Sequence, residues 1–271
     1  MGASGHQQPK VPPMQPKPAN SPADFYRENG YYLARGLYSA AEAKTLEADF
    51  DRIVEQIIAG GEKKINATWQ ARMNAEVPNA AILHAKQLHM YSPRWLQAWQ
   101  DPRFLDLAEA FLGPDIILHH SKLFLKPPGR GAGFPPHQDW SYFPTEEDTS
   151  CLAAVIHLSP ADEANGCLRI FPGSHKDGRI VQDRGLSDVP EIDRRYPIDQ
   201  GVPVEAMPGD VVFFSSLTVH GSLPNRSPMP RKTVLVQLHR GSDWIDPTLH
   251  ANARLVLRGW NHRMTAGASE G

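Results

Sequence analysis

Three side chains in this sequence have the types that hold a redox-active metal in proteins: His137, Asp139 and His220. His137 and Asp139 are two residues apart, so on an extended strand both side chains point to one face. His220 follows a strongly apolar run at 211–216, which predicts a strand, and precedes a glycine. Two histidines and one carboxylate form the facial triad of non-haem Fe(II) oxygenases. The set predicts an iron site, although a His-x-Asp pair alone also occurs where the histidine makes only a structural hydrogen bond.

A cation and a hydroxyl group follow His220 closely in the sequence. An α-keto acid that chelates the metal would leave its far carboxylate in need of a cationic partner. Arg231, at the start of a predicted strand, can bind a carboxylate through two parallel hydrogen bonds. Ser222 can add a hydroxyl hydrogen bond to the same group. These residues predict an α-keto acid as cosubstrate.

Alternation along the predicted strand 116–126 groups further side chains. His120, Lys122 and Phe124 fall on one face of this strand, and leucines fall on the other. On pattern alone, this face either lines a pocket or is a solvated outer face, because lysine is rarely buried without a partner.

Other ring side chains carry weaker signals. Trp140 and Tyr142 follow the His-x-Asp pair and are candidates to line a substrate cavity, although aromatic residues on barrel strands often belong to the core. His175, in a Pro-Gly turn, is expected to form a loop-stabilising hydrogen bond. The histidines without a partner motif are expected to be ordinary core or surface residues: His84, His89, His119, His157, His239 and His250.

The composition is that of an ordinary globular protein. Apolar residues make up 41% and charged residues 21% of the 271 residues, so a sizeable core can be buried. A formal charge of -2 argues against nucleic acid and anionic membranes as partners, and favours a small molecule, while the oligomeric state stays open. Cys151 and Cys167 are expected to be reduced packing residues. The sequence shows neither a signal-peptide pattern nor an apolar run of the ~20 residues that span a bilayer, which predicts a cytoplasmic location.

Helical patterns precede strand patterns along the chain. Ser39 with Glu42 forms a capping box that opens one helix, and Asp101 with Pro102 opens a second that ends at Gly113. Short β-type runs follow, separated by Gly and Pro, at 116–126, 151–158, 167–171, 202–206, 211–216 and 232–239. Without βαβ alternation, these runs predict an α+β, mainly β chain: a jelly roll with an N-terminal helical layer.

The ends of the chain and one insertion differ from the rest. Residues 1–22 contain six prolines and few large apolar side chains, which predicts a disordered tail or, alternatively, a polyproline ligand. Residues 23–262 are expected to form one domain, followed by a flexible tail at 263–271. The segment 176–199 contains eleven charged residues and is expected to be either a lid over the barrel mouth or mobile surface.

Several short motifs follow one another in a fixed order: Lys126-Pro-Pro-Gly129, His137-Gln-Asp139, Asn165-Gly-Cys-Leu168, Pro172-Gly-Ser-His175, then His220 and Arg231. With these motifs in this order, the chain resembles the phytanoyl-CoA dioxygenase family over roughly residues 23 to 245. The resemblance implies a double-stranded β-helix of the cupin-like kind, with Fe(II) as metal and 2-oxoglutarate and O2 as cosubstrates.

The resemblance also implies roles for individual residues. His137, Asp139 and His220 would hold the iron, and Arg231 and Ser222 would bind the 2-oxoglutarate carboxylate. Since the strand that precedes the iron-binding motif lines the pocket in this family, His120 and Lys122 resemble substrate or cosubstrate contacts. We assign Lys122 to the cosubstrate and His120, with Phe124 on the same face, to the substrate. Trp140 and Tyr142, which follow the motif, are further candidates for substrate contacts.

The implied reaction is hydroxylation of an unactivated C–H bond of a small molecule, with release of succinate and CO2. A secondary metabolite is the expected substrate, from the breadth of the family alone. Desaturation, epoxidation or ring formation would use the same cofactor chemistry. Asp139 disfavours halogenation, because related halogenases have a small residue in its place. A non-oxidative cupin-like metal enzyme or a binding module remains the alternative from a different class.

Overall fold

Two antiparallel β-sheets face each other in the computed structural model, which describes residues 21–59, 83–129, 131–180, 190–246, 248 and 252–263. The larger sheet consists of β1 (Tyr31–Ala34), β2 (Leu83–Lys86), β3 (Ile116–Lys126), β5 (Cys151–His157), β8 (Val211–Ser215), β10 (Arg231–Arg240) and β11 (Leu255–Arg258). The smaller sheet consists of β4 (Phe134–His137), β6 (Leu168–Ile170), β7 (Val202–Val204) and β9 (His220–Ser222). Two such facing sheets are the architecture of a jelly roll.

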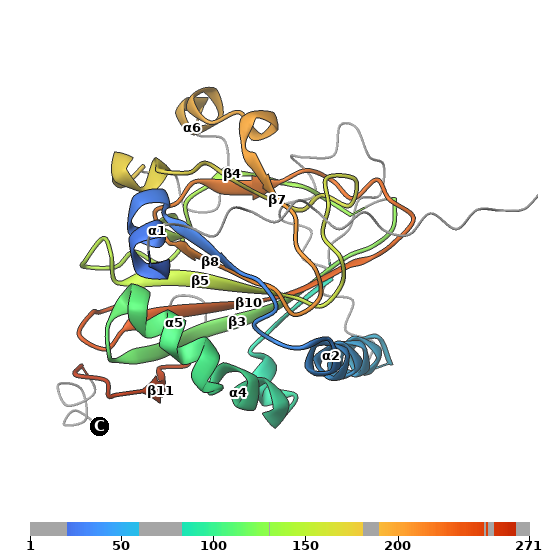
Figure 1. The fold of residues 1–271 in the computed structure, drawn as a ribbon, viewed down its shortest axis with the longest axis horizontal. Helices are drawn as coiled ribbons and strands as arrows, with labels where there is room; N and C mark the ends of the chain where they lie inside the picture. The colour runs from blue at the N-terminus through green and yellow to red at the C-terminus, as the bar shows by residue number, and fades with distance from the viewer. Residues whose placement is uncertain are drawn as a thin grey trace, which may run out of the picture.

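The strand order explains how the sheets are built. The larger sheet runs β1-β8-β5-β10-β3-β11, with β2 paired to β3, and the smaller sheet runs β4-β9-β6-β7. Strands distant in sequence are therefore neighbours. The helices are α1 (Pro22–Asn29), α2 (Ala40–Ala59), α4 (Pro93–Trp99), α5 (Pro102–Leu112) and α6 (Pro190–Arg195). Figure 1 shows α4 and α5 on one side of the larger sheet, and β4 and β7 on the other.

Each central strand of the larger sheet buries both of its faces. On β5, Leu152, Ala154 and Ile156 pack into the core under the helices, whereas Ala153 and Val155 belong to a second apolar cluster on the opposite face. Successive residues of a strand point to opposite faces, so one run of buried residues serves both layers. This opposite face, toward the smaller sheet, is where a cavity forms.

Both predicted helices of the covering layer are confirmed. The Glu42 backbone N–H donates to Ser39 Oγ at 3.3 Å, and the Ser39 N–H donates to the Glu42 carboxylate at 2.7 Å, as a capping box requires. Asp101 caps α5 by accepting a first-turn backbone N–H at 2.9 Å. Phe104 of α5 packs on Phe213 of β8, with ring centroids 5.3 Å apart. The helices thus pack against the outer face of the larger sheet.

All six predicted strands are present, as β3, β5, β6, β7, β8 and β10, and their ends differ from the prediction by at most two residues. β1, β9, α1 and α4 were not predicted, because runs of three to eight residues show little periodicity. The strand expected to carry the His137-Gln-Asp139 motif is present as β4, but it ends at His137. Ser21 and Pro22, placed in the predicted tail, form the N-cap and first residue of α1. The rest of that tail, and almost all of 263–271, lie outside the described residues.

Two further predictions concern single features. Cys151 and Cys167 are free and buried, as expected. Within the described ranges, the structure contains no helix with the length and apolar character needed to span a bilayer.

Candidate active site

The three predicted metal ligands meet where two short strands pair. β4 ends at His137, β9 begins at His220, and these residues are register partners. Nε2 of His137 lies 3.8 Å from Oδ1 of Asp139, and Nε2 of His220 lies 3.7 Å from the same oxygen. One possible ligand atom from each side chain lies within 4.8 Å of the others, and all three side chains are buried.

A backbone carbonyl orients each histidine ring. His137 Nδ1 donates to the Pro135 carbonyl at 2.8 Å, and His220 Nδ1 donates to the Thr218 carbonyl at 2.9 Å. Because a carbonyl can only accept, Nδ1 of each ring carries a proton, and Nε2 of each ring faces Asp139. Burial, and next the charge of His220, lowers the pKa of His137 well below its usual value. The His137 ring is therefore neutral, which is the form that binds metals.

The residues present fit a divalent metal ion. Oδ2 of Asp139 is buried and has no hydrogen-bond partner among the described residues. Burying a carboxylate oxygen in this way costs free energy unless a cation or a hydrogen-bond donor lies against it. Two imidazoles and a carboxylate are the ligand set of non-haem Fe(II) sites, and they leave coordination positions open.

Asp139 does not lie on the strand that its spacing predicts. β4 stops at His137, and Asp139 opens the 3-10 helix η3 (Asp139–Ser141). Gln138 keeps an extended backbone, with φ -107° and ψ 133°, so the side chains on either side of it still converge. The Gln138 amide donates to the Leu217 carbonyl at 2.7 Å, just before β9. The middle residue of the motif therefore ties the two ligand-bearing segments together.

The triad faces a cavity of about 170 Å³ between the two sheets. Alternate residues of β3, β5 and β10, together with Phe214 of β8, form one wall, and residues of β4 and β9 contribute to the other. Its apolar lining includes Phe124, Phe134, Phe143, Phe214 and Leu235. A small, mostly apolar cavity with a few convergent polar groups is the usual form of a small-molecule site.

A second polar part of the cavity is built around Arg231, which is 6% exposed. Its Nη1 donates to the Gly166 carbonyl, whereas its Nε has no partner and no carboxylate pairs with it among the described residues. Burial lowers the pKa of Arg231 to about 10. The neighbouring Lys126 is fully buried and donates from Nζ to the Ser222 hydroxyl at 2.7 Å. Burial, and next the charge of Arg231, lowers the pKa of Lys126 well below its usual value, and Lys126 is not among the residues that line the cavity in the described chain. Arg231, a buried guanidinium without an acidic counter-ion there, makes this wall suited to an anion.

Four of the predicted pocket residues line the cavity: His120, Lys122, Phe124 and Tyr142. The first three confirm the alternation on β3, with Leu123 buried on the opposite face. Burial lowers the pKa of Lys122 to about 8, while the charge of Asp139 opposes this shift. Lys122 therefore shares the metal side of the cavity, and contacts of these residues with ligands stay predictions.

Two predicted residues lie elsewhere. Trp140 does not belong to the cavity lining of the described chain, and its ring lies 4.9 Å from the guanidinium carbon of Arg179. A contact of Trp140 with the substrate stays a prediction. His175 serves its loop as expected, since its Nε2 donates to the Arg27 carbonyl at 3.1 Å.

Several lining residues were not predicted. β10 contributes four alternate residues to the cavity: Arg231, Thr233, Leu235 and Gln237. Alternation counted from Arg231 would have identified the other three. His84 and His157, expected to be ordinary core or surface residues, also line the cavity. No local pattern marks them, because their positions follow from the pairing of β2 with β3 and of β5 with β10.

The charged insertion at 176–199 is described only at its two ends. One apolar cluster joins both ends to the residue before His220: Ile180, Ile192, Tyr196 and Val219. In Figure 1, α6 lies on the side of the smaller sheet that faces away from the larger sheet. The expected lid stays a prediction, since residues 181–189 lie outside the described ones.

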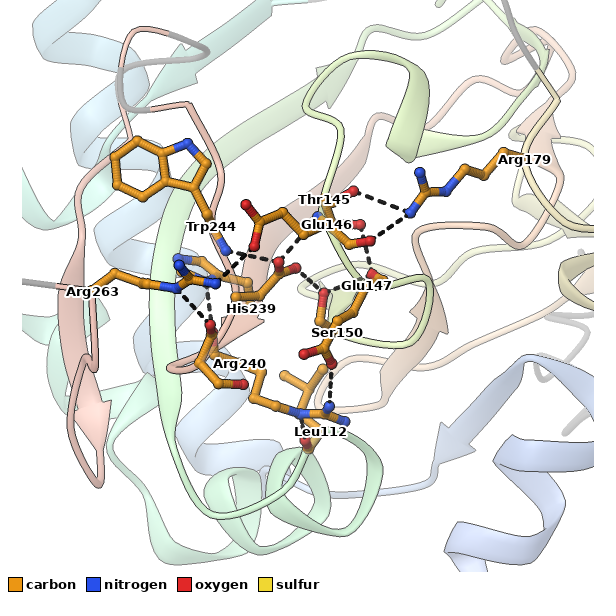
Figure 2. A network of polar contacts seen from close by, with 12 residues as sticks. Leu112, Thr145, Glu146, Glu147, Ser150, Arg179, His239, Arg240, Trp244 and Arg263 are labelled. Atoms are coloured by element: carbon orange, nitrogen blue, oxygen red, sulfur yellow. Dashed lines mark hydrogen bonds and ion pairs between the residues drawn. The ribbon is translucent and has the colours of Figure 1, made fainter.

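A polar network fixes the segment that follows η3, and Figure 2 shows its members. Asp243 is 2% exposed and accepts hydrogen bonds from the Glu146 backbone N–H at 3.0 Å and from the Ser150 hydroxyl. Arg240, at the end of β10, forms an ion pair with Glu147 at 2.7 Å. The network therefore anchors the loop that begins with Tyr142 and Phe143, which both line the cavity.

We expect Asp243→Ala to lower the free energy of unfolding by about 3 kcal/mol, because it leaves buried donors without an acceptor and each charge-assisted hydrogen bond contributes about 1.5–3 kcal/mol. Chemical denaturation measures this loss. The control is Asp106→Ala, whose side chain is 69% exposed and whose loss we expect to stay within about 0.5 kcal/mol. Equal losses in the two variants would contradict a structural role for the network.

The fold and the site define a class: a double-stranded β-helix that gathers two histidines and a carboxylate at a buried cavity. The model of the phytanoyl-CoA dioxygenase (PhyH) family matches residues 26–233, and the chain belongs to this family. Peroxisomal phytanoyl-CoA dioxygenase from Bos taurus is 28% identical over 225 residues, which are 78% of this chain and 65% of that protein. The chain thus spans less than two-thirds of that relative.

A second relative and a solved structure are also similar to this chain. Ectoine dioxygenase from Bordetella parapertussis is 26% identical over 243 residues, which are 82% of this chain and 75% of that protein. The crystal structure of the non-heme alpha ketoglutarate dependent carbocyclase SnoK from nogalamycin biosynthesis matches with a TM-score of 0.69 and 24% identity, covering 85% of this chain and 87% of that one. The structural likeness confirms the fold.

Proposed function

We propose that this protein is an Fe(II)- and 2-oxoglutarate-dependent dioxygenase that hydroxylates a C–H bond of a small molecule. One observation carries the proposal: a two-histidine, one-carboxylate cluster and a buried guanidinium without an acidic partner in the described chain line the same cavity. Neither group alone would suffice. Together they match a cosubstrate that chelates a metal at one end and carries a carboxylate at the other.

The spacing along β9 supports the match. His220 begins this strand and Ser222 ends it, which separates them by about 6.6 Å at about 3.3 Å per residue. The four C–C bonds of 2-oxoglutarate, about 1.5 Å each, reach across such a distance. Ser222 and Arg231 both line the cavity, so the far carboxylate would meet the Ser222 hydroxyl and the Arg231 guanidinium.

Each side chain has a role in this proposal. His137, Asp139 and His220 hold the iron. Hydrogen bonds to backbone carbonyls fix the orientation of the two histidine rings, so that Nε2 of each ring points to the metal position. The iron, when bound, supplies activation of O2. Arg231 and Ser222 bind and orient the far carboxylate. The aromatic wall excludes water from the reacting region.

The substrate class follows from the remaining lining. Phe124, Phe134 and Tyr142 offer an apolar surface to a hydrocarbon portion, and His120 and Lys122 offer polar contacts near the metal side. A secondary metabolite fits this description. Two relatives are named dioxygenases, one of phytanoyl-CoA and one of ectoine, and these names favour hydroxylation as the outcome. One solved structure of similar fold is named a carbocyclase, so ring formation or desaturation are kept as variants.

We also propose one catalytic domain over residues 23–262, acting in the cytoplasm on a small molecule. The continuous core cluster, which joins residues of α2 to Leu257 of β11, supports the single domain. The small net charge of -2 supports a small molecule as the partner.

An anaerobic titration followed by a turnover assay tests the proposal. The Fe(II)-loaded protein should bind 2-oxoglutarate without O2, and admission of O2 with candidate substrates should release succinate in proportion to product. Omitting Fe(II) or 2-oxoglutarate should abolish that release. If the Fe(II)-loaded protein does not bind 2-oxoglutarate, the proposal fails and a non-oxidative metal enzyme becomes the better description.

A further inference from the structure

His157 is a buried histidine whose ring has no hydrogen-bond partner in the described part of the chain. It ends β5, is 1% exposed, and lines the same cavity as the triad. Neither Nδ1 nor Nε2 meets a protein donor or acceptor there. A buried polar group left in this state costs about 1–3 kcal/mol, so such a ring is typical of a place where a ligand completes the hydrogen bonds.

The strand register places His157 on the wall that carries Arg231. His157 is the register partner of Thr233 on β10. Thr233 is two residues after Arg231, so both side chains project from the same face, and both line the cavity. Arg231 also retains a buried nitrogen, Nε, with no partner among the described residues. Two incompletely bonded groups on one wall therefore face the same space.

The ring is in a state that can donate one hydrogen bond. Burial, followed by the positive charges of Arg231 and Arg35, lowers the pKa of His157 to about 3. The imidazole is therefore neutral at physiological pH and carries one N–H donor and one acceptor nitrogen. A carboxylate has room for about four hydrogen bonds, so an arginine and a histidine can share it.

We propose that His157 donates a hydrogen bond to the far carboxylate of the cosubstrate beside Arg231, and that it thereby helps the site select a dicarboxylic keto acid over a monocarboxylic one. This inference rests on the proposed function. It adds a specificity residue at a position where local sequence patterns indicate nothing. It also explains why the cavity leaves a buried imidazole unbonded on this wall.

The test compares two ligands that differ only at the far end. Binding of 2-oxoglutarate and of 2-oxopentanoate, which lacks the far carboxylate, is measured by calorimetry on anaerobic Fe(II)-loaded protein. In His157→Leu we expect the Kd for 2-oxoglutarate to rise about tenfold, as loss of one hydrogen bond to a charged group predicts. The Kd for 2-oxopentanoate should change less than about twofold, because the carboxylate contact is missing from the start.

Two further variants control for folding and for hydrogen bonding. His157→Gln keeps an N–H donor and should restore 2-oxoglutarate affinity to within about threefold of the wild type. His239→Leu removes a comparably buried imidazole that is not among the cavity-lining residues, and should leave both affinities unchanged. Thermal unfolding of each variant shows that it is folded. In turnover assays, His157→Leu should raise KM for 2-oxoglutarate and leave kcat close to the wild-type value.

The outcomes separate this inference from the proposed function. If the Kd values for both ligands rise equally in His157→Leu, His157 only shapes the cavity and the inference is overturned. Wild-type affinity for 2-oxoglutarate in that variant would overturn it as well. If the wild-type protein binds neither ligand, the proposed function itself fails.

Discussion

In the His137→Ala variant we expect 2-oxoglutarate-dependent succinate release to fall to background. His137 provides one of three ligand atoms that lie within 4.8 Å of one another, and its loss leaves only Asp139 and His220. Removal of a residue that merely supports a ligand costs about 10–100-fold in metal affinity. Loss of a ligand itself should exceed that range, so Fe(II) affinity should fall more than about 100-fold.

Two measurements check this expectation. A titration gives the Fe(II) affinity directly, and the rise in Tm on adding Fe(II), which wild-type protein should show because the metal binds the folded state, should be absent from the variant. His175→Ala is the control, since His175 bonds to a backbone carbonyl of α1 outside the cavity. Undiminished succinate production in His137→Ala would exclude His137 as a ligand.

The second large effect is expected for Arg231→Ala, in which 2-oxoglutarate binding should weaken by at least about 100-fold while Fe(II) binding stays largely intact. Breaking a buried, hydrogen-bonded charge pair costs about 2–5 kcal/mol. The far carboxylate would still meet Ser222, but it would lose the planar set of donors that Arg231 presents. Calorimetric titration of the Fe(II)-loaded variant measures the loss.

Two variants make the Arg231 result specific. Arg231→Lys keeps a cation without the planar fork, and should bind 2-oxoglutarate with intermediate affinity. Arg169→Ala removes another buried arginine, which donates to the Gly201 carbonyl at 2.8 Å and is not part of the cavity lining, and should retain cosubstrate affinity. Wild-type affinity for 2-oxoglutarate in Arg231→Ala would refute the assignment of this cosubstrate.

Local patterns predicted the elements that carry their signal within one segment. The capping box of Ser39 and Glu42 and the long strand β3 appear where expected, because periodicity and capping depend on neighbouring residues. β9, which bears His220, is three residues long and shows too little pattern to detect. The convergence of Asp139 with His137 was predicted correctly, although a 3-10 turn rather than a strand produces it.

The residue types in the chain and the order of its motifs were enough to identify the available chemistry and the family. The pairing of His137 with His220, the contact of Lys126 with Ser222 across 96 positions, and the shared wall of His157 and Arg231 appear only in the folded structure. The reason is that register is a property of two strands: a slip of one residue turns every side chain to the opposite face, and no single strand specifies its partner.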